Sequence, residues 1–451
     1  MRTLLIIMVG LTSIPAWGQD ELEHYITEGL EHNIVMKQRN ITLERATYAL
    51  RAAKSMYLPA IALQAGYQTA DGGRNIPLPI GDLLNPVYRT LNQLTASDAF
   101  PMIENETINF LPRNYYDAHI RTTLPLINPE IGANKRIQER QVHLSELDVD
   151  IYKRELVKDI KVAYFNYLAA VHALDIYRSA VDLAREGRRT NQKLLENGKG
   201  LPAYVQRSHS EVAEAEARLT EAEVKAQNAR AYFNSLLNRS EQAEVDTVFD
   251  HEAAILDAAA VLTNGPSTAV EREELRSLST AIDIRSTQLK LNRRFAVPRL
   301  NAFLDLGSQS EGFHFNGQTR YYMVGLQLEM PLFSGNRNMY KIQQSRFDLQ
   351  EAELQWEQAR QQLQMAGTVA TNNLRAAWNN YQSSKSQLEA AEAYRRLITK
   401  GYEAGSNSYI ETVDARNQYT SAHIALIVRT YEVLSAAAIL EREQASYLLT
   451  P

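Results

Sequence analysis

Two histidines and a glutamate come closer than any other residues in the sequence to forming a metal site. His24 and His32 are eight residues apart with Glu28 between them, so a helix would place all three on one face. Two histidines on a solvated helix are more often ordinary surface residues, and two ligands make a weak zinc site. The sequence also lacks a nucleophile elbow, a phosphate-binding glycine loop and a histidine–glutamate metal motif. We therefore predict a protein that is not an enzyme and needs no cofactor.

Polar side chains alternate with apolar ones in four short segments. Successive side chains of a strand point to opposite faces, so each segment predicts one apolar and one polar face. A polar face suits a water-filled lumen, with the apolar face toward lipid. A half-buried soluble sheet alternates in the same way, so the pattern alone leaves both interpretations open. The candidate lumen residues are Asp117, His119, Arg121, Asp305, Gln327 and Glu329.

The four segments have the length that a membrane strand needs. They cover residues 60–68, 115–126, 299–309 and 321–332, near the ten residues that cross a bilayer core at a tilt. Four strands cannot close a barrel, because the smallest membrane barrels have about eight. An open edge in lipid would leave backbone groups unsatisfied at several kcal/mol each. A lipid-facing sheet therefore requires several chains in one barrel: two chains would supply eight strands and three chains would supply twelve.

The remaining sequence predicts unusually long helices. Apolar residues recur at three- and four-residue steps through 133–195 and 338–401, which would each be roughly 95 Å long at about 1.5 Å per residue. Helices of this length indicate a coiled coil or a tube rather than a globule. No run of 18 apolar residues follows residue 18, so no transmembrane helix is predicted. Shorter helices are predicted at 21–55, 203–238, 267–295 and 408–447.

The chain contains the same layout twice. Tyr115-Tyr116 precedes Pro125 at the spacing by which Tyr321-Tyr322 precedes Pro331, and hairpin glycines follow at Gly198 and Gly405. We predict a first repeat over 19–240, an inter-repeat or equatorial segment over 241–265 and a second repeat over 266–451. Each Pro is expected to end its strand. Residues 70–113 form an insertion, which we expect to be extracellular with a short helix near 87–97.

The composition and the N-terminal sequence restrict where in the cell the protein is expected and which partners it can have. Arg2, the mostly apolar stretch Leu4–Trp17 and the small residues at Ala16 and Gly18 predict a secretory signal peptide over 1–18. Cysteine is absent, which excludes disulfides, thiolate metal sites and a lipid-anchoring cysteine. The net charge of −5 argues against nucleic acid as a partner, because nucleic-acid binding requires a basic surface.

Taken together, these features resemble the TolC family of outer-membrane efflux proteins. The resemblance rests on the signal peptide, the doubled strand–strand–long-helix unit, the Pro-Leu pairs at 125–126 and 331–332, and the segment 402–415. It implies a homotrimer in which a twelve-stranded barrel in the outer membrane continues as an α-helical tunnel through the periplasm. It also implies a periplasmic adaptor protein and an inner-membrane pump as partners. The cargo is not implied.

The resemblance further implies a periplasmic gate at the tunnel tip. The family's acidic ring corresponds to Glu411 and Asp414, and a gate tyrosine corresponds to Tyr402. The family's gate arginine is replaced by Asn407 and an acidic residue of the first hairpin by Tyr204, so a Tyr204–Asn407 contact is one candidate replacement. Three copies of the acidic pair would raise some carboxylate pKa values and attract cations. Alternatively, the two acids are ordinary residues of a helix N-terminus.

A periplasmic coiled-coil adaptor or scaffold is the alternative function. It would explain the long helices, but it would give the four alternating segments no role.

Overall fold

The computed structural model describes residues 17–264 and 272–449, which form two compact units. The helical unit contains Arg140–Arg285, Asp348–Pro451 and the chain up to Thr47, and the strand unit contains Tyr48–Glu139 and Ser286–Phe347. Of the predicted signal peptide, residues 1–16 lie outside the described residues. Helix α1 begins at Trp17.

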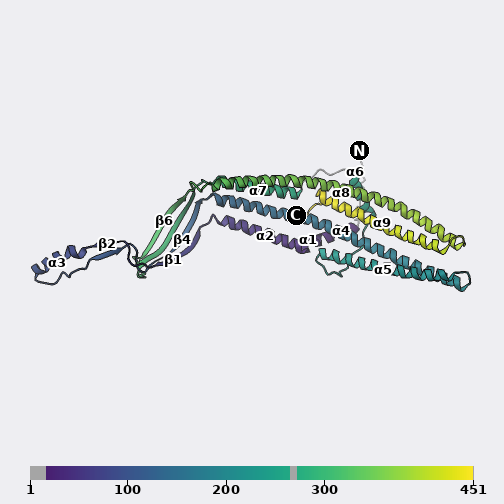
Figure 1. Ribbon diagram of the computed structural model, residues 1–451, viewed down its shortest axis with the longest axis horizontal. Helices are drawn as coiled ribbons and strands as arrows, with labels where there is room; N and C mark the ends of the chain where they lie inside the picture. Colours follow the sequence, from purple (N-terminus) through teal and green to yellow (C-terminus); the bar gives the residue numbers. More distant parts are fainter. Residues whose placement is uncertain (1–16, 265–271, 450–451) are drawn as a thin grey trace, which may run out of the picture. The chain divides into compact units, whose positions relative to one another are not determined.

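The strand unit is built on a four-stranded antiparallel sheet (Figure 1). Its strands are β1 (Ala60–Gln68), β4 (Tyr115–Ile127), β5 (Arg299–Glu311) and β6 (Arg320–Glu329). Their spatial order is β1-β4-β5-β6, so β1 pairs only with β4 and β6 only with β5 within the described chain. The sheet therefore has two edges whose backbone groups lack a partner strand.

The two faces of this sheet differ in the way the alternation predicts. Apolar side chains on one face are exposed in the single chain, including Leu63 (76%), Tyr322 (76%) and Leu326 (67%). On the other face, Asp305 is fully inaccessible to solvent. The sheet thus exposes its apolar face, unlike a soluble sheet, while its polar face buries Asp305 but leaves Gln327 and Glu329 exposed.

The expectation that each proline ends its strand is wrong in detail. Pro125 lies inside β4, which continues to Ile127 with a shift of register between these two residues. Strand β6 stops at Glu329, two residues before Pro331, rather than at residue 332. Because proline has no N–H for the ladder, it sits at an irregularity in β4 and outside β6.

The insertion forms a small hairpin of its own. Strand β2 (Asn75–Leu78) pairs with β3 (Glu106–Asn109), and α3 (Ile80–Thr95) lies between them. The predicted helix near 87–97 starts too late. Helix α3 begins at Ile80 and continues through Pro86. The insertion leaves the sheet at the ends of β1 and β4 opposite to those that join α2 (Ile34–Ser55) and α4 (Pro129–Glu196) (Figure 1).

Two very long helices dominate the rest of the chain. Helix α4 has 68 residues, and α8 (Arg337–Glu403) has 67. A tight turn connects α4 to α5 (Pro202–Leu236), and another connects α8 to α9 (Tyr409–Gln444). These four helices confirm the predicted long and short helical stretches, with ends shifted by a few residues.

Three helical details differ from the sequence prediction. The predicted helix 21–55 is two helices, α1 (Trp17–His32) and α2, separated at Asn33. A helix that was not predicted, α6 (His251–Asn264), occupies the inter-repeat segment. Helix α7 (Glu273–Arg293) begins later than the predicted residue 267, and residues 265–271 lie outside the described ranges.

The break at Asn33 has a clear cause. Its side-chain oxygen accepts hydrogen bonds from the backbone N–H groups of Val35 (2.9 Å) and Met36 (3.1 Å), which makes Asn33 the N-cap of α2. Its amide nitrogen donates to the carbonyl of Leu236 at the end of α5 (2.8 Å). Asn33 is buried, so this one side chain both ends a helix and ties two helices together.

An aromatic and aliphatic core holds the helical unit together. Tyr25 of α1 packs its ring edge against Phe233 of α5 at 5.1 Å, and Tyr164 of α4 lies 5.6 Å from Phe233. Tyr431 of α9 belongs to the same buried cluster. The core therefore joins α1, α4, α5 and α9.

The expectation of no membrane-spanning helix needs one correction. Helix α9 contains an 18-residue window with a mean hydropathy of 1.5, enough by length and composition to cross a membrane. The same helix contributes Tyr431, Val433 and Leu434 to the buried cores. Core packing accounts for part of this apolar composition, since 33% of the window is buried, and Arg429 and Glu432 interrupt the apolar run in the sequence.

Candidate channel wall and gate

A bidentate ion pair lies on the polar face of the sheet. Arg121 of β4 donates from Nε to Asp305 Oδ1 (2.8 Å) and from Nη2 to Oδ2 (2.6 Å). The two residues are directly opposed in the register of β4 and β5. The guanidinium also lies over the ring of Phe303, 5.3 Å from its centroid. Paired in this way, the two charges cancel locally on a surface that the sequence assigned to the lumen.

A second polar group lies closer to the N-terminal end of β4. Asp117 accepts a hydrogen bond from the hydroxyl of Tyr321 on β6 (2.9 Å), and His119 Nδ1 lies 3.1 Å from the same carboxylate. The other ring nitrogen of His119 lies 3.1 Å from Gln64 of β1. The polar face thus links all four strands, and the period of two that marks Gln327 and Glu329 would also have identified Tyr321.

Gln327 and Glu329 lie apart from these two groups. They are on β6 opposite Asn301 and Arg299, near the helical end of the strands, and both are exposed. The six sequence-predicted lumen residues thus share one face. Four of them form two hydrogen-bonded groups.

The predicted hairpin tips are tight glycine turns. Gly198 between α4 and α5 has φ 69°, and Gly405 between α8 and α9 has φ 79°. Glycine occupies this left-handed region without steric cost, which explains why it occurs at both tips.

Hydrogen bonds join the two hairpins close to their tips. Tyr402 of α8 donates to the side-chain oxygen of Asn191 on α4 (3.2 Å). Tyr409 of α9 donates to Glu211 of α5 (2.8 Å), and its ring lies 5.7 Å from the ring of Tyr204. Burial, followed by the bond to Glu211, raises the pKa of Tyr409 to about 12. Tyr409 therefore stays a hydrogen-bond donor at neutral pH.

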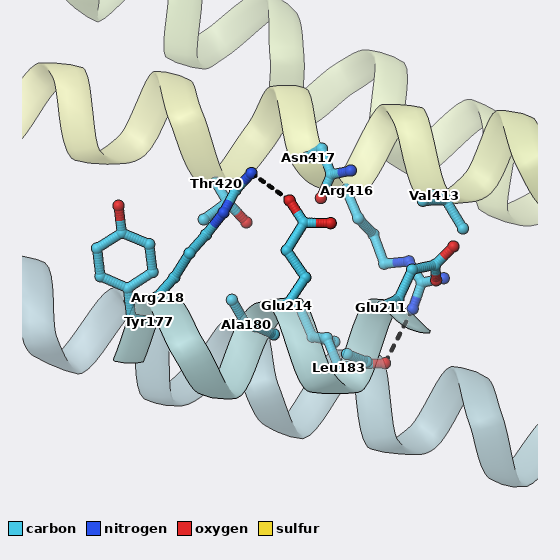
Figure 2. Close-up of a pocket in the computed structure, with 12 residues that line it drawn as sticks. Tyr177, Ala180, Leu183, Glu211, Glu214, Arg218, Val413, Arg416, Asn417 and Thr420 are labelled. Carbon is cyan, nitrogen blue, oxygen red and sulfur yellow. Dashed lines mark hydrogen bonds and ion pairs between the residues drawn. The ribbon is translucent and has the colours of Figure 1, made fainter. Parts of the chain in front are cut away.

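Arg416 of α9 adds a further link, which the sequence did not predict. Its Nη1 donates to the backbone carbonyl of Leu183 on α4 (2.9 Å), beside a small cavity of about 50 Å³ between α4, α5 and α9 (Figure 2). The guanidinium reaches this carbonyl next to Gly187, where an added Cβ would lie 2.7 Å from Nη1. Nothing in the local sequence pairs positions 183 and 416, so only the fold reveals this contact.

The acidic pair is divided between two environments in the single chain. Glu411 and Ser408 form a capping box at the start of α9, with the Ser408 N–H donating to the Glu411 carboxylate (2.6 Å). This hydrogen bond lowers the pKa of Glu411, opposite to the direction expected from crowded carboxylates. Asp414 is exposed and accepts a hydrogen bond from Gln418 (2.8 Å). Within one chain, Glu411 thus acts as a helix-capping residue.

Asn407 contributes to the turn rather than to a charged latch. Its backbone N–H donates to the carbonyl of Gly401 (3.2 Å), which closes the α8 end of the tip. Tyr204 packs against Tyr409 with its ring tilted by 44°, and the Tyr204–Asn407 contact stays a prediction.

A cluster of ion pairs lies where the start of α7 meets the end of α9. Arg272 contacts Glu274 (2.6 Å) and Glu443 (2.7 Å), and Arg442 contacts Glu155 of α4 (2.9 Å). Arg154 of α4 forms a bidentate pair with Glu273, with both bonds at 2.8 Å. No motif marked these residues in the sequence, because they come from three separate stretches of the chain.

The histidine pair, His24 and His32, lies on helix α1. Among the described residues, no group of three or more metal-binding side chains is placed to hold an ion. The Nδ1 atom of His32 lies 3.1 Å from the backbone carbonyl of Glu28, so this ring contacts its own helix.

The long paired helices and the open sheet with an exposed apolar face together define the architecture of outer-membrane channels. The outer membrane protein VceC of Vibrio cholerae has the same fold, with a TM-score of 0.72 at 15% sequence identity, over 96% of this chain and 98% of that chain.

Sequence comparisons agree with this fold. The alkaline protease secretion protein AprF of Pseudomonas aeruginosa is 25% identical over 72% of this chain and 69% of its own length. The outer membrane protein TolC of Escherichia coli is 20% identical over 96% and 84%. The sequence model described as "Outer membrane efflux protein" matches residues 26–239 and 266–442. The chain belongs to this outer membrane efflux protein family, which makes it an outer-membrane channel rather than a periplasmic scaffold.

Proposed function

We propose that three copies of this chain share one twelve-stranded barrel and form the exit duct of a tripartite efflux or secretion system. The observation that carries this proposal is the sheet with two unpaired edges, β1 and β6, and an exposed apolar face. In lipid, such edges must be paired, because unpaired backbone groups cost several kcal/mol each. Pairing β1 of one copy with β6 of the next satisfies both edges.

In this assembly the polar face of the sheet lines the lumen. Asp117, His119, Arg121 and Asp305 then surround the water-filled barrel, and the apolar stripe that includes Leu326 faces lipid. The long helices α4 and α8, with α5 and α9, form the tunnel wall in the periplasm. Their near-equal lengths support the proposed internal duplication, with repeats over 19–240 and 266–451 joined by 241–265.

The partners we infer are a periplasmic adaptor and an inner-membrane pump. A duct has no energy source of its own, so a pump must drive transport through it. The relative AprF is described as an alkaline protease secretion protein, which supports a secretion or efflux system as the setting.

The gate that we propose lies at the helical tips. Tyr402, Tyr409 and Arg416 hold the α8–α9 hairpin to α4 and α5, so a conformational change that opens the tip must break these contacts. Three copies of Glu411 and Asp414 around the axis would favour cations. Tyr204 and Asn407 complete the proposed gate at the same tips.

The lipid-facing assignment is tested by two neighbouring residues of β6. Leu326→Arg places a charge on the apolar face, at a cost of about 2–4 kcal/mol near the bilayer midplane. Gln327→Arg places the same charge on the polar face. In planar bilayers, we expect discrete conductance steps from the unaltered protein and from Gln327→Arg, and impaired insertion of Leu326→Arg. A protein that is soluble without detergent and does not conduct would overturn the proposal.

A further inference from the structure

Helix α3 carries an apolar stripe that no part of the described chain covers. Leu83, Val87 and Leu94 are 70%, 52% and 78% exposed. At about 100° per residue their directions fall within about 40° of one another, so they form one line along the helix. An uncovered apolar line of this kind marks an interaction surface.

The opposite side of α3 is held firmly by its own hairpin. Asn85 exchanges two hydrogen bonds with the backbone of Ile103, both at 2.9 Å, and Asn92 does the same with Phe100 at 2.8 and 3.0 Å. The ring of Tyr88 lies 5.7 Å from that of Phe100. The apolar stripe is therefore presented by a fixed helix and cannot turn inward.

Charge argues against a lipid surface as the occupant. Helices that lie on membranes carry a polar face rich in lysine and arginine. The only charged residues of α3 are Asp82 and Arg89, one of each sign, and neither lies on the stripe. A neutral stripe can meet an identical stripe without repulsion.

The position of the insertion points to further copies of the chain. It joins β1, an edge strand, to β4, at the end of the sheet away from the helices (Figure 1). In the proposed trimer, on which this inference rests, each insertion rises from the seam with the next copy. We propose that the α3 stripes of three copies pack against one another outside the barrel and narrow its external opening.

The absence of native cysteine allows a direct test with single-cysteine variants in outer-membrane preparations. Leu83→Cys and Leu94→Cys place thiols on the stripe, and Arg89→Cys places one on the far side of the same helix. Under mild oxidation we expect disulfide-linked dimers from the first two variants, with one unpaired chain per trimer, and monomers from Arg89→Cys.

Conductance provides a second measurement. Leu83→Asp with Leu94→Asp should separate the stripes and raise the single-channel conductance, whereas Arg89→Asp with Gln93→Asp should leave it unchanged. The α3 contact is refuted if neither measurement distinguishes the two sides of the helix while native mass spectrometry still gives a trimer. That result would leave the proposed exit duct unaffected. A monomer in detergent would instead refute the duct. A Leu83→Cys thiol that forms no dimer but is shielded from soluble maleimide only in membranes would also refute the contact, and would indicate lipid.

Discussion

Arg121 and Asp305 are direct cross-strand partners on the polar face of the sheet, and their side chains form two hydrogen bonds, of 2.8 and 2.6 Å. Planar guanidinium and carboxylate groups match each other in this bidentate geometry, and such charge-assisted bonds are stronger than neutral hydrogen bonds. In the proposed barrel, three such pairs contribute no net charge to the lumen.

Removing the carboxylate should make the lumen more positive. Asp305→Asn leaves Arg121 without its counter-charge in each copy, so we expect the permeability to shift toward anions. Reversal potentials measured in a salt gradient would show this shift. The double variant Arg121→Gln with Asp305→Asn restores neutrality and should return to the original selectivity. An unchanged reversal potential in Asp305→Asn would place this pair outside the conduction path.

Loosening the helical tips should favour the open channel. Tyr409→Phe keeps the ring against Tyr204 but removes the hydrogen bond to Glu211, which as a bond to a charged group is worth about 1.5 kcal/mol. We expect a roughly tenfold shift per chain toward the open state, seen as more frequent long openings in single-channel records.

Arg416→Ala should act in the same direction by releasing α9 from the Leu183 carbonyl. Exposed Arg360→Ala on α8, far from this contact in the sequence, is the matched control and should not change gating. Unaltered openings in both tip variants would remove these residues from the gate.

The Arg154–Glu273 pair should make the free energy of unfolding depend on pH in the acid range. Burial favours the neutral acid, but the hydrogen bonds and charge of Arg154 outweigh it, so the pKa of Glu273 lies below its usual value. The resulting stabilisation is present above the ordinary glutamate pKa of 4.5 and is lost as pH falls through the lowered value.

Glu273→Gln tests this linkage. Near neutral pH it should cost about 3 kcal/mol, because it leaves the largely buried guanidinium of Arg154 without a counter-charge. The difference in Tm from the unaltered protein should shrink below pH 4.5. Exposed Glu353→Gln should follow the unaltered protein throughout. A Tm difference that stays constant on acidification would exclude the proposed linkage.

Asn33→Ala should destabilise the helical unit. The change removes the N-cap of α2 and the bond to Leu236, for a loss of about 1–2 kcal/mol. Thermal unfolding followed by circular dichroism in detergent measures this loss. Asn33→Ser keeps a capping oxygen and should lose less; equal losses would assign the effect to the contact with Leu236 alone.

Much of the architecture could be predicted because it depends on local periodicity. The alternation around Arg121 and the three- and four-residue steps around Tyr164 repeat over many residues, so strands and long helices were found. The break at Asn33 was missed because a single buried side chain ends the helix through contacts 203 residues away in the chain. Arg416 was missed for the same reason, since its partner Leu183 is distant in the sequence.

The mass of the intact complex shows whether several chains share one barrel. Native mass spectrometry of the protein released from detergent micelles should give three times the mass of the mature chain. Leu326→Arg, with its charge on the lipid face, should reduce that species, whereas Gln327→Arg should not. A predominant single-chain mass for the unaltered protein under conditions that retain its helical content would rule out the shared barrel.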